Sequence, residues 1–300
     1  MRVGLQLRAE HPDDAVAAAR RAEELGYDIV LVADHVGSDL SPLLTLAAVA
    51  AGTERIRIGT YVLNAALHHP LLLARDIVTL DQQSGGRVQL GLGAGHAATE
   101  FAACGVPFPA ARERKRRLAA FVEVVRRLLD GETVDHHGDG MELSGAAVGR
   151  STVQARVPIL VGGSGHGLLT HAARHADIVG LTGLGRTLPD GHRHTVRFGP
   201  GVVDAEVEMV RQAAAGRPVE IDVLVQVVDV TDDREAAANS LAGDIEDLSV
   251  EDALATPYLA LGTVEEIGDH LRRAHERWGL DSIVVRDAEA FAPVLPLLPD

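Results

Sequence analysis

The stretch IRIGTYVLNAALHHPLLLARDIVTLDQQSGGRVQLGLGAG at residues 56–95 shows the pattern on which the whole chain is built. It opens and closes with short runs rich in β-branched and apolar residues, RIGTYVL and VQLGLG, and a longer amphipathic stretch lies between them. This alternation is typical of a β-α-β unit, in which a helix joins two parallel strands across the face of a sheet. We therefore expect one such unit here.

The same alternation extends along the chain. Eight strand candidates, separated by longer amphipathic stretches, begin near Arg2, Asp28, Ile56, Arg87, Val157, Asp177, Glu220 and Asp281. Each run is apolar almost without interruption, as in strands that are covered on both faces. The pattern predicts a single-domain (β/α)8 TIM barrel over residues 1–300. An open, doubly wound sheet is the alternative, because a count of strands does not exclude it.

Two longer stretches break this rhythm, and they predict insertions after strands 4 and 6 of the barrel. They cover residues 132–156 and 183–200. Long loops at strand ends are often functional. The second stretch is rich in His and Arg, so we expect it to reach the open face of the site.

Capping residues mark several helix boundaries. Thr263 and Glu266 have the spacing of a capping box. Ser41 followed by Pro42 predicts a helix that begins with proline in its first turn, and Gly26 is expected to end the preceding helix in the left-handed conformation.

Composition and charge restrict the classes of partner. The chain has 43 acidic and 28 basic residues and a net charge of −15, which argues against binding to nucleic acid or to an anionic membrane surface. No apolar run approaches the roughly 20 residues that span a bilayer. The only cysteine, Cys104, has no partner for an internal disulfide, and no signal peptide is visible, so we expect a cytoplasmic protein.

Polar residues and glycines replace the apolar runs where the predicted strands end. In a barrel the carboxyl ends of the strands carry the active site. The segments at the ends of the second to sixth strands therefore provide the site candidates: Asp34, His35, Tyr61, Val62, Asn64, Gly93, Ala94, His96, Gly162, Gly163, Ser164 and Thr182.

Two glycine-rich segments lie among these strand ends. GGSGHG at 162–167 precedes a helix, so its backbone N–H groups could hold a phosphate, although a plain glycine-rich turn would have the same sequence. GLGAG at 91–95 has the wrong spacing for a dinucleotide fingerprint. Its glycines either let a flat ligand approach the backbone or relieve crowding inside the barrel, and the spacing does not decide between these interpretations.

The histidines do not form a recognisable metal motif. His35 could donate a hydrogen bond or carry a proton, or it could simply accompany a helix-capping Asp34. His171 and His175 lie four residues apart on a predicted helix, and His192 and His194 form an HxH pair, but neither pair has the HExxH arrangement. We place both pairs outside the cluster of strand ends and predict no metal. A GxSxG nucleophile motif is also missing.

The spaced motifs together resemble a known family. VADH at 32–35, GTYVLN at 59–64, the segment 69–95, PILVGGSG at 158–165 and GTVEEIGDHLRR at 262–273 resemble the luciferase-like monooxygenase superfamily, and within it the coenzyme F420-dependent oxidoreductases of actinobacteria.

The resemblance implies roles for individual residues. Asp34 and His35 would lie beside the deazaflavin ring, with Asn64 at the polar edge of the ring. A non-proline cis peptide between Tyr61 and Val62 would support the ring. The segment Gly162, Gly163 and Ser164 would hold the cofactor phosphate.

Two positions depart from the sugar-phosphate dehydrogenases of that superfamily. His96 stands where those enzymes have a proton-donating Glu, and Leu184 stands where they have a phosphate-binding Lys. A sugar phosphate is therefore not assigned as the substrate. His96 either transfers a proton or shapes the pocket. Glu100 matches a Glu common in the superfamily, for which we expect a structural role.

These observations predict an oxidoreductase that moves a hydride between F420 and a small organic substrate with an activated C=C, C=N or alcohol/carbonyl group. His35 and His96 are the candidate catalytic residues, and the family habit is a homodimer. An FMN-dependent luciferase-like monooxygenase is the alternative within the same class. A non-catalytic cofactor-binding protein and a metal-dependent hydrolase barrel, which would bind zinc, are alternatives from other classes.

Overall fold

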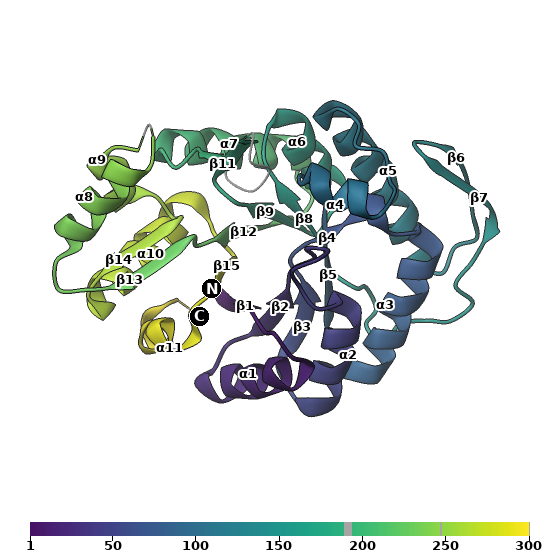
Figure 1. Cartoon of the computed structure of the whole chain (residues 1–300), viewed down its shortest axis with the longest axis horizontal. Helices are drawn as coiled ribbons and strands as arrows, with labels where there is room; N and C mark the ends of the chain where they lie inside the picture. Colours follow the sequence, from purple (N-terminus) through teal and green to yellow (C-terminus); the bar gives the residue numbers. More distant parts are fainter. Residues whose placement is uncertain (189–193, 247, 300) are drawn as a thin grey trace.

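A computed structural model describes residues 1–188, 194–246 and 248–299, and eight parallel strands in it close into a barrel (Figure 1). Neighbouring strands pair in the order β3-β2-β1-β15-β12-β9-β8-β5, and β3 pairs with β5 through Ile58 and Val88 to close the ring. The closed ring confirms the (β/α)8 prediction and rules out the open sheet. The barrel strands are β1 (Arg2–Leu7), β2 (Ile29–Val32), β3 (Arg57–Thr60), β5 (Val88–Gly93), β8 (Ile159–Gly163), β9 (Ile178–Leu181), β12 (Glu220–Leu224) and β15 (Ser282–Val285).

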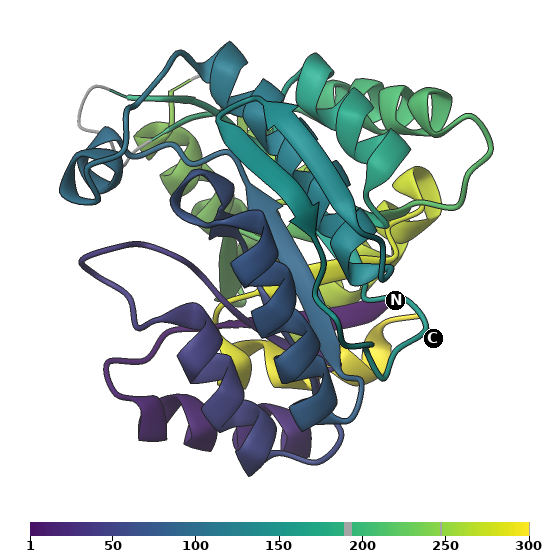
Figure 2. The ribbon, with the colours of Figure 1, turned by 90° about the vertical axis from the view of Figure 1, so that its right-hand side faces the viewer.

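Helices surround this ring and bury their apolar faces against it. In α10, for example, Ile267, Leu271, Ala274 and Trp278 recur at helical spacing and are all buried. The chain ends meet, because the Met1 amino group donates to the Pro299 carbonyl, and Figure 2 shows the two ends side by side. The helices are α1 (Pro12–Leu25), α2 (Pro42–Gly52), α3 (Pro70–Ser84), α4 (Ala98–Ala103), α5 (Ala111–Leu129), α6 (His166–His175), α7 (Pro200–Ala214), α10 (Val264–Trp278) and α11 (Ala288–Phe291), with the 3-10 turns η1 (Ala65–Leu67) and η2 (Ala292–Leu297).

The three predicted helix boundaries are present, and two of them have the expected cap geometry. Thr263 and Glu266 form both hydrogen bonds of the capping box. Gly26 ends α1 with φ 95°, in the left-handed region. Ser41 precedes α2 with Pro42 in the first turn, but its side chain forms no capping hydrogen bond.

Both predicted insertions are β-hairpins. After the fourth barrel strand, β6 (Val134–Gly138) pairs antiparallel with β7 (Met141–Ala146). After the sixth, β10 (Leu184–Thr187) pairs antiparallel with β11 (His194–Val196). The third strand has a two-residue continuation, β4 (Leu63–Asn64), which pairs with β5.

The apolar run IDVLVQVVDV that follows Glu220 reads as one strand in the sequence, but in the structure it forms two. β12 stays in the barrel, whereas β13 (Val227–Val230) leaves it and pairs with β14 (Leu259–Gly262), a strand that the sequence pattern did not indicate. The chain leaves the barrel between residues 225 and 226. The Val225 N–H donates to the Val284 carbonyl of the barrel, whereas the Gln226 N–H donates to the Tyr258 carbonyl outside it. Helices α8 (Arg234–Asp244) and α9 (Val250–Ala255) complete this third insertion.

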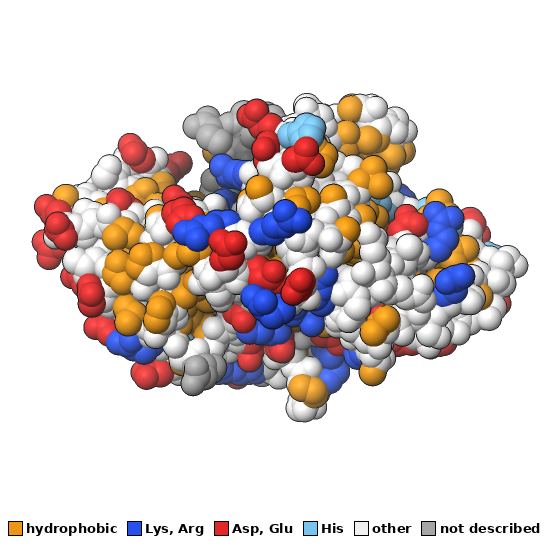
Figure 3. Space-filling view, turned by 90° about the horizontal axis from the view of Figure 1, so that it is seen from below, with side chains coloured by type: hydrophobic (Ala, Val, Ile, Leu, Met, Phe, Trp, Pro, Cys, Tyr) orange, Lys and Arg blue, Asp and Glu red, His pale blue; other side chains and the backbone are white. Residues whose placement is uncertain are grey.

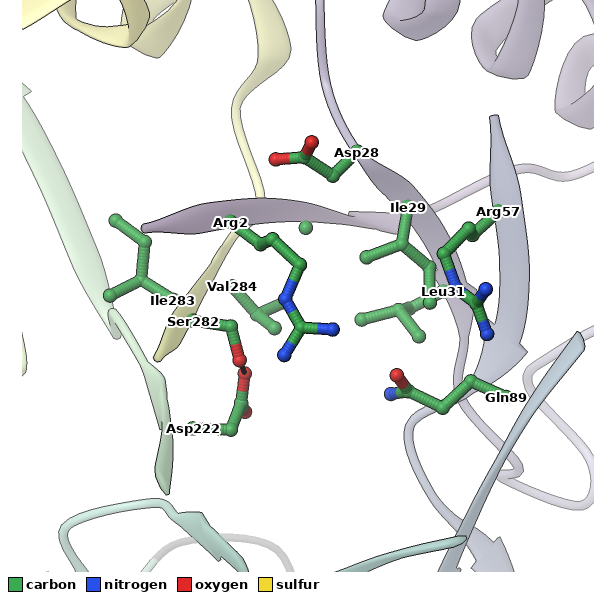
Figure 4. A pocket seen from close by; sticks show the side chains of 11 residues that line it. Arg2, Asp28, Ile29, Leu31, Arg57, Gln89, Asp222, Ser282, Ile283 and Val284 are labelled. Atoms are coloured by element: carbon green, nitrogen blue, oxygen red, sulfur yellow. Dashed lines mark hydrogen bonds between the residues drawn. The ribbon is translucent and has the colours of Figure 1, made fainter. Parts of the chain in front are cut away.

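The barrel interior is apolar in the middle and polar at its base. Ile29, Leu31, Leu160, Leu224 and Val284 belong to one buried cluster inside the ring. A cavity of only about 20 Å³ lies at the amino-terminal end of the barrel, where Asp222 and Ser282 face each other beside Arg2 (Figure 4). The interior is therefore a packed core rather than a channel.

The surface in Figure 3 carries acidic and basic side chains side by side, and no broad basic patch is visible among the described residues of that face. Within the described ranges, no helix is both long enough and apolar enough to cross a bilayer.

Candidate active site

A cavity of about 930 Å³ lies at the carboxyl ends of the barrel strands. Every site residue predicted from the sequence lines it: Asp34, His35, Tyr61, Val62, Asn64, Gly93, Ala94, His96, Gly162, Gly163, Ser164 and Thr182. Their individual roles stay predictions, but the structure brings all of them to one place.

Glycines allow the backbones of the third and fourth barrel strands to approach each other at the floor of this cavity. A Cβ on Gly91 would lie 2.1 Å from the Thr60 carbonyl oxygen, and a Cβ on Gly93 would lie 2.6 Å from Cγ2 of Val62. The peptide bond between Tyr61 and Val62 is cis, as the family resemblance implied. Gly91 and Gly93 thus both relieve crowding, and Gly93 also lines the cavity. The approach of a flat ligand to this backbone stays a prediction.

Tyr61 contributes its backbone to the cavity wall, while its hydroxyl reaches into the barrel. Its Oη donates to Oδ2 of Asp222 at 2.6 Å, and Ser282 Oγ donates to the other carboxylate oxygen at 2.6 Å. Burial raises the pKa of Asp222 to about 6, although these two hydrogen bonds partly oppose the effect. Tyr61 is therefore held between the site above and a buried carboxyl below.

A chain of polar side chains connects the third strand to the sixth across the mouth. Gln6 Nε2 donates to the Tyr61 carbonyl at 3.2 Å and its Oε1 accepts from Arg286 Nε at 2.8 Å. Arg286 Nη1 donates to Oε1 of Gln226 at 3.0 Å, and Gln226 Nε2 donates to the Thr182 carbonyl at 2.8 Å. The sequence analysis missed Gln6, Gln226 and Arg286. The available signal was a polar residue within or directly after an apolar strand run.

Asn64 presents a hydrogen-bond donor to the cavity. Its Oδ1 accepts from the Ala66 N–H at 3.2 Å, and its backbone N–H donates to Oδ2 of Asp34 at 3.0 Å. Nδ2 is buried and has no partner among the described residues. A buried donor without an acceptor is costly, so this atom is suited to a polar edge of a bound ligand.

Asp34 is ionised and tied to its surroundings. Burial alone would raise its pKa, but hydrogen bonds from His68 and from the Asn64 N–H, together with the charges of His68 and His35, outweigh burial and lower the pKa. His68 Nε2 lies 3.2 Å from Oδ2 of Asp34. Asp34 therefore fixes the position of Asn64 as well as lining the cavity.

Three histidines and one glutamate meet at the cavity rim. His35 Nδ1 lies 2.8 Å from Oε1 of Glu100, and Glu100 is buried whereas the His35 side chain is 45% exposed. The His96 ring centroid lies 5.7 Å from that of His35 and 4.8 Å from that of His194. The prediction that His194 lies outside the cluster was wrong, because the β10–β11 hairpin brings this residue over the mouth. His192 lies outside the described residues.

The segment from Gly162 to Gly165 has the form expected of an anion cradle. Gly163 has φ 150° and Gly165 has φ 87°, and α6 begins directly afterwards at His166. A Cβ on Gly163 would lie 2.5 Å from Cδ2 of Leu168. Lys115 Nζ, from α5, donates to the Ser164 carbonyl at 2.8 Å. The helix dipole and this ammonium both favour an anion here.

His171 and His175 lie away from the cavity. Their rings stack with centroids 4.4 Å apart, and with Glu123 they form a group whose possible ligand atoms lie within 4.8 Å of one another. None of the three lines the cavity. The absence of a metal from this protein stays a prediction.

The sequence model of the luciferase-like monooxygenase family matches residues 1–279. The chain belongs to this family. An F420-dependent glucose-6-phosphate dehydrogenase of Amycolatopsis mediterranei is 35% identical over 187 residues, which cover 59% of this chain and 56% of the relative. The protein of the same name from Nocardia farcinica is 32% identical over 240 residues, covering 76% of this chain and 68% of the relative. The chain thus spans only about half the length of the first of these relatives.

Among solved structures, the family fold recurs in the coenzyme F420-dependent tetrahydromethanopterin reductase of Methanopyrus kandleri. It matches with a TM-score of 0.76 over 99% of this chain and 98% of that one, at 20% identity. This likeness shows the shared fold of the luciferase-like family. Within that fold, the two departures from the sugar-phosphate dehydrogenases, His96 and Leu184, both line the cavity.

Proposed function

We propose that this chain is an F420-dependent oxidoreductase that transfers a hydride between the deazaflavin and a small organic substrate. The observation that carries the proposal is the single cavity in which a glycine floor, the buried donor of Asn64 and the anion cradle at Gly162–Gly163 lie together. Two curated relatives named F420-dependent glucose-6-phosphate dehydrogenase support it.

The residues present fit this cofactor. Val62, Gly93 and Ala94 offer a flat floor for a ring, Asn64 Nδ2 offers a donor to its polar edge, and the backbone of Gly162, Gly163 and Ser164 offers donors to a phosphate. When bound, the cofactor supplies a carbon that accepts or gives up a hydride. The protein orients the substrate against that carbon and supplies a proton carrier.

His35 is the proton carrier that the contacts favour. Glu100 holds its Nδ1, so Nε2 is the atom that exchanges a proton with a substrate in the cavity. His96 lines the same rim and is the second candidate. We propose a substrate with an activated C=C, C=N or alcohol/carbonyl group. A sugar phosphate is not assigned as the substrate, because Leu184 offers no charge at the position where the sugar-phosphate dehydrogenases have a Lys.

Cofactor binding and turnover test the proposal together. Reduced and oxidised F420 and FMN are titrated with the protein while fluorescence quenching is measured, and F420 turnover is then followed spectrophotometrically with a panel of alkenes, imines and alcohols. We expect saturable F420 binding and turnover with at least one substrate class. Tight FMN binding without F420 binding would favour a flavin monooxygenase. F420 binding without any turnover would favour a non-catalytic binding protein.

We also propose that the chain forms one domain, works in the cytoplasm and assembles as a homodimer through α2. The residues of α2 that are exposed or half-buried are all apolar: Leu43, Leu44, Ala47, Ala48 and Ala51, with Gly52 at the end. Leu44 is 73% exposed, and Leu72 in the first turn of the adjacent α3 is 49% exposed. A surface helix without a polar face is typical of an interface.

A further inference from the structure

Basic side chains gather where the anion cradle meets α5. Residues 112–117 read RERKRR, five cations and one acid in a chain whose net charge is −15. Arg114 and Lys115 from this run line the cavity, and so does Arg197, which follows β11. The ammonium of Lys115 lies 3.2 Å from the position that a Cβ on Gly165 would occupy. Lys115 therefore lies directly beside the cradle, and Arg114 and Arg197 line the same cavity.

The two arginines have different kinds of partner within the protein. Arg114 donates to the carbonyls of Gly95 at 3.1 Å and Pro109 at 2.6 Å. Arg197 lies 3.5 Å from a carboxylate oxygen of Glu206. Both are thus anchored by the protein itself.

Like Arg114, Lys115 has no counter-charge among the described residues, whereas Arg197 has Glu206. The hydrogen-bond acceptor of Lys115 is the neutral Ser164 carbonyl, and no carboxylate among the described residues forms an ion pair with it. Partial burial and the nearby charges of Arg114 and Arg197 lower the pKa of Lys115, so the free protein holds this ammonium at a cost. An anion placed beside it would remove that cost.

We propose that Lys115, with Arg114 and Arg197 behind it, is an anion subsite that binds the charged side chain of the cofactor beyond its ring. This inference rests on the proposed function. F420 carries a phosphodiester followed by lactate and a chain of glutamates, so phosphate and carboxylate oxygens leave the ring in sequence. The backbone cradle has no charge of its own, and Lys115 would supply a cation beside it, next to Ser164 and Gly165.

Binding constants for a series of ligands test the subsite. Fluorescence quenching is measured with the phosphate-free deazaflavin precursor of F420, with F420 lacking glutamates, and with F420 carrying several glutamates. Lys115→Gln is expected to weaken binding of long-tailed F420 by about tenfold or more, which is the usual effect of losing a hydrogen bond to a charged group. Binding of the phosphate-free ring should be unchanged, and the loss for F420 without glutamates isolates the contribution of the phosphate.

Two further variants control the experiment. Lys115→Arg keeps the charge and should retain most of the affinity. Arg116→Gln removes the neighbouring charge, but Arg116 is exposed, pairs with Asp139 at 3.2 Å and does not line the cavity, so its affinities should match those of the unmodified protein. Raising the salt concentration should reduce the difference between Lys115→Gln and the unmodified protein.

The outcomes separate the subsite from the proposed function. An equal loss of affinity for the phosphate-free ring and for F420 would mean that Lys115 only supports the Ser164 loop, and it would overturn the inference, as would no loss for any ligand. If the unmodified protein binds neither ligand, the proposed function itself fails and the subsite falls with it. A loss that grows with the charge of the ligand supports the subsite.

Discussion

Contacts between single residues define what His35 can do. Glu100 is buried on α4, and its carboxylate accepts the proton on Nδ1 of His35. The partner of one ring nitrogen fixes the tautomer and leaves the other nitrogen for chemistry. We therefore propose that Glu100 positions His35, a more specific role than the structural one that the sequence suggested.

Glu100→Gln tests this role. An amide can offer either an oxygen or an NH₂ group to Nδ1, so the tautomer of His35 would no longer be fixed. We expect kcat to fall by about 10–100-fold while the dissociation constant for F420 stays nearly unchanged. Glu123→Gln, a change of the same kind on the exposed side of α5, should leave both quantities unaltered. An unchanged kcat in Glu100→Gln would remove Glu100 from the mechanism.

For single residues, the sequence predicted which side chains lie at the site better than it predicted their hydrogen-bond partners. Asp34, Asn64 and Gly163 were predicted because they directly follow apolar strand runs, and the barrel geometry brings the ends of its strands together. The contact between Glu100 and His35 joins residues 65 positions apart, and Arg286 and Gln226 are 60 apart. Such partners depend on side-chain directions in the folded barrel, which a linear pattern does not contain.

The loop between β8 and α6 acts at the scale of elements, because it joins a barrel strand to a helix N-terminus beside Lys115. Gly163→Ala places a Cβ at φ 150°, in a region that favours glycine, and 2.5 Å from Leu168. We expect at least tenfold weaker F420 binding, because the loop or α6 must shift. Gly167→Ala is the matched control, since a Cβ there meets nothing within 4 Å. Equal affinities in the two variants would show that the loop does not hold the cofactor.

The buried carboxyl of β12 predicts a pH dependence of stability. The pKa of Asp222 is raised by burial to about 6, above its ordinary value of 3.8. A raised pKa of an acid means that the folded state keeps the proton longer, so its stabilising effect is present below pH 4 and is lost as pH rises through 6. The difference between these two pKa values corresponds to about 3 kcal/mol in the free energy of unfolding.

Urea unfolding of the protein and of Asp222→Asn between pH 4.5 and 7.5 measures this effect. The free energy of unfolding of the unmodified protein should fall relative to that of the variant as pH rises. Because Asn does not titrate, the variant should lack this component. Parallel curves for the two proteins would contradict the raised pKa.

The strands also show which features of the fold an apolar sequence pattern does not predict. The barrel strands were predictable because both faces of each are buried, which makes the run continuously apolar. The run from residue 220 to 230 is equally apolar, yet its second half is covered by β14 and not by the barrel. Apolar periodicity reports burial but does not identify the covering element. The segment that forms β10 and β11 was expected to reach the site. The contact between His194 and His96 was not predicted, because it depends on how the hairpin folds over the cavity.

At the scale of the whole molecule, α2 is the feature that a single chain leaves unexplained. It packs between α1 and α3 on the barrel, and its outward side is made of leucine and alanine. Because α2 and α3 both begin on the carboxyl side of the barrel, Leu44 and Leu72 lie at the same end of the molecule. A second copy of the chain could bury this surface favourably, because few polar groups would lose their contact with water.

Leu44→Arg tests this assembly. We expect the unmodified protein to have twice the chain mass in light scattering at micromolar concentration, and the variant to have the mass of a single chain, because an unpaired guanidinium would be buried in the interface. Val230→Arg is the matched control: Val230 is 43% exposed on β13, outside the barrel and away from α2, so this variant should stay dimeric. F420 binding should persist in both variants, since neither residue lines the cavity. A monomeric unmodified protein would show that the apolar side of α2 is not an interface between copies.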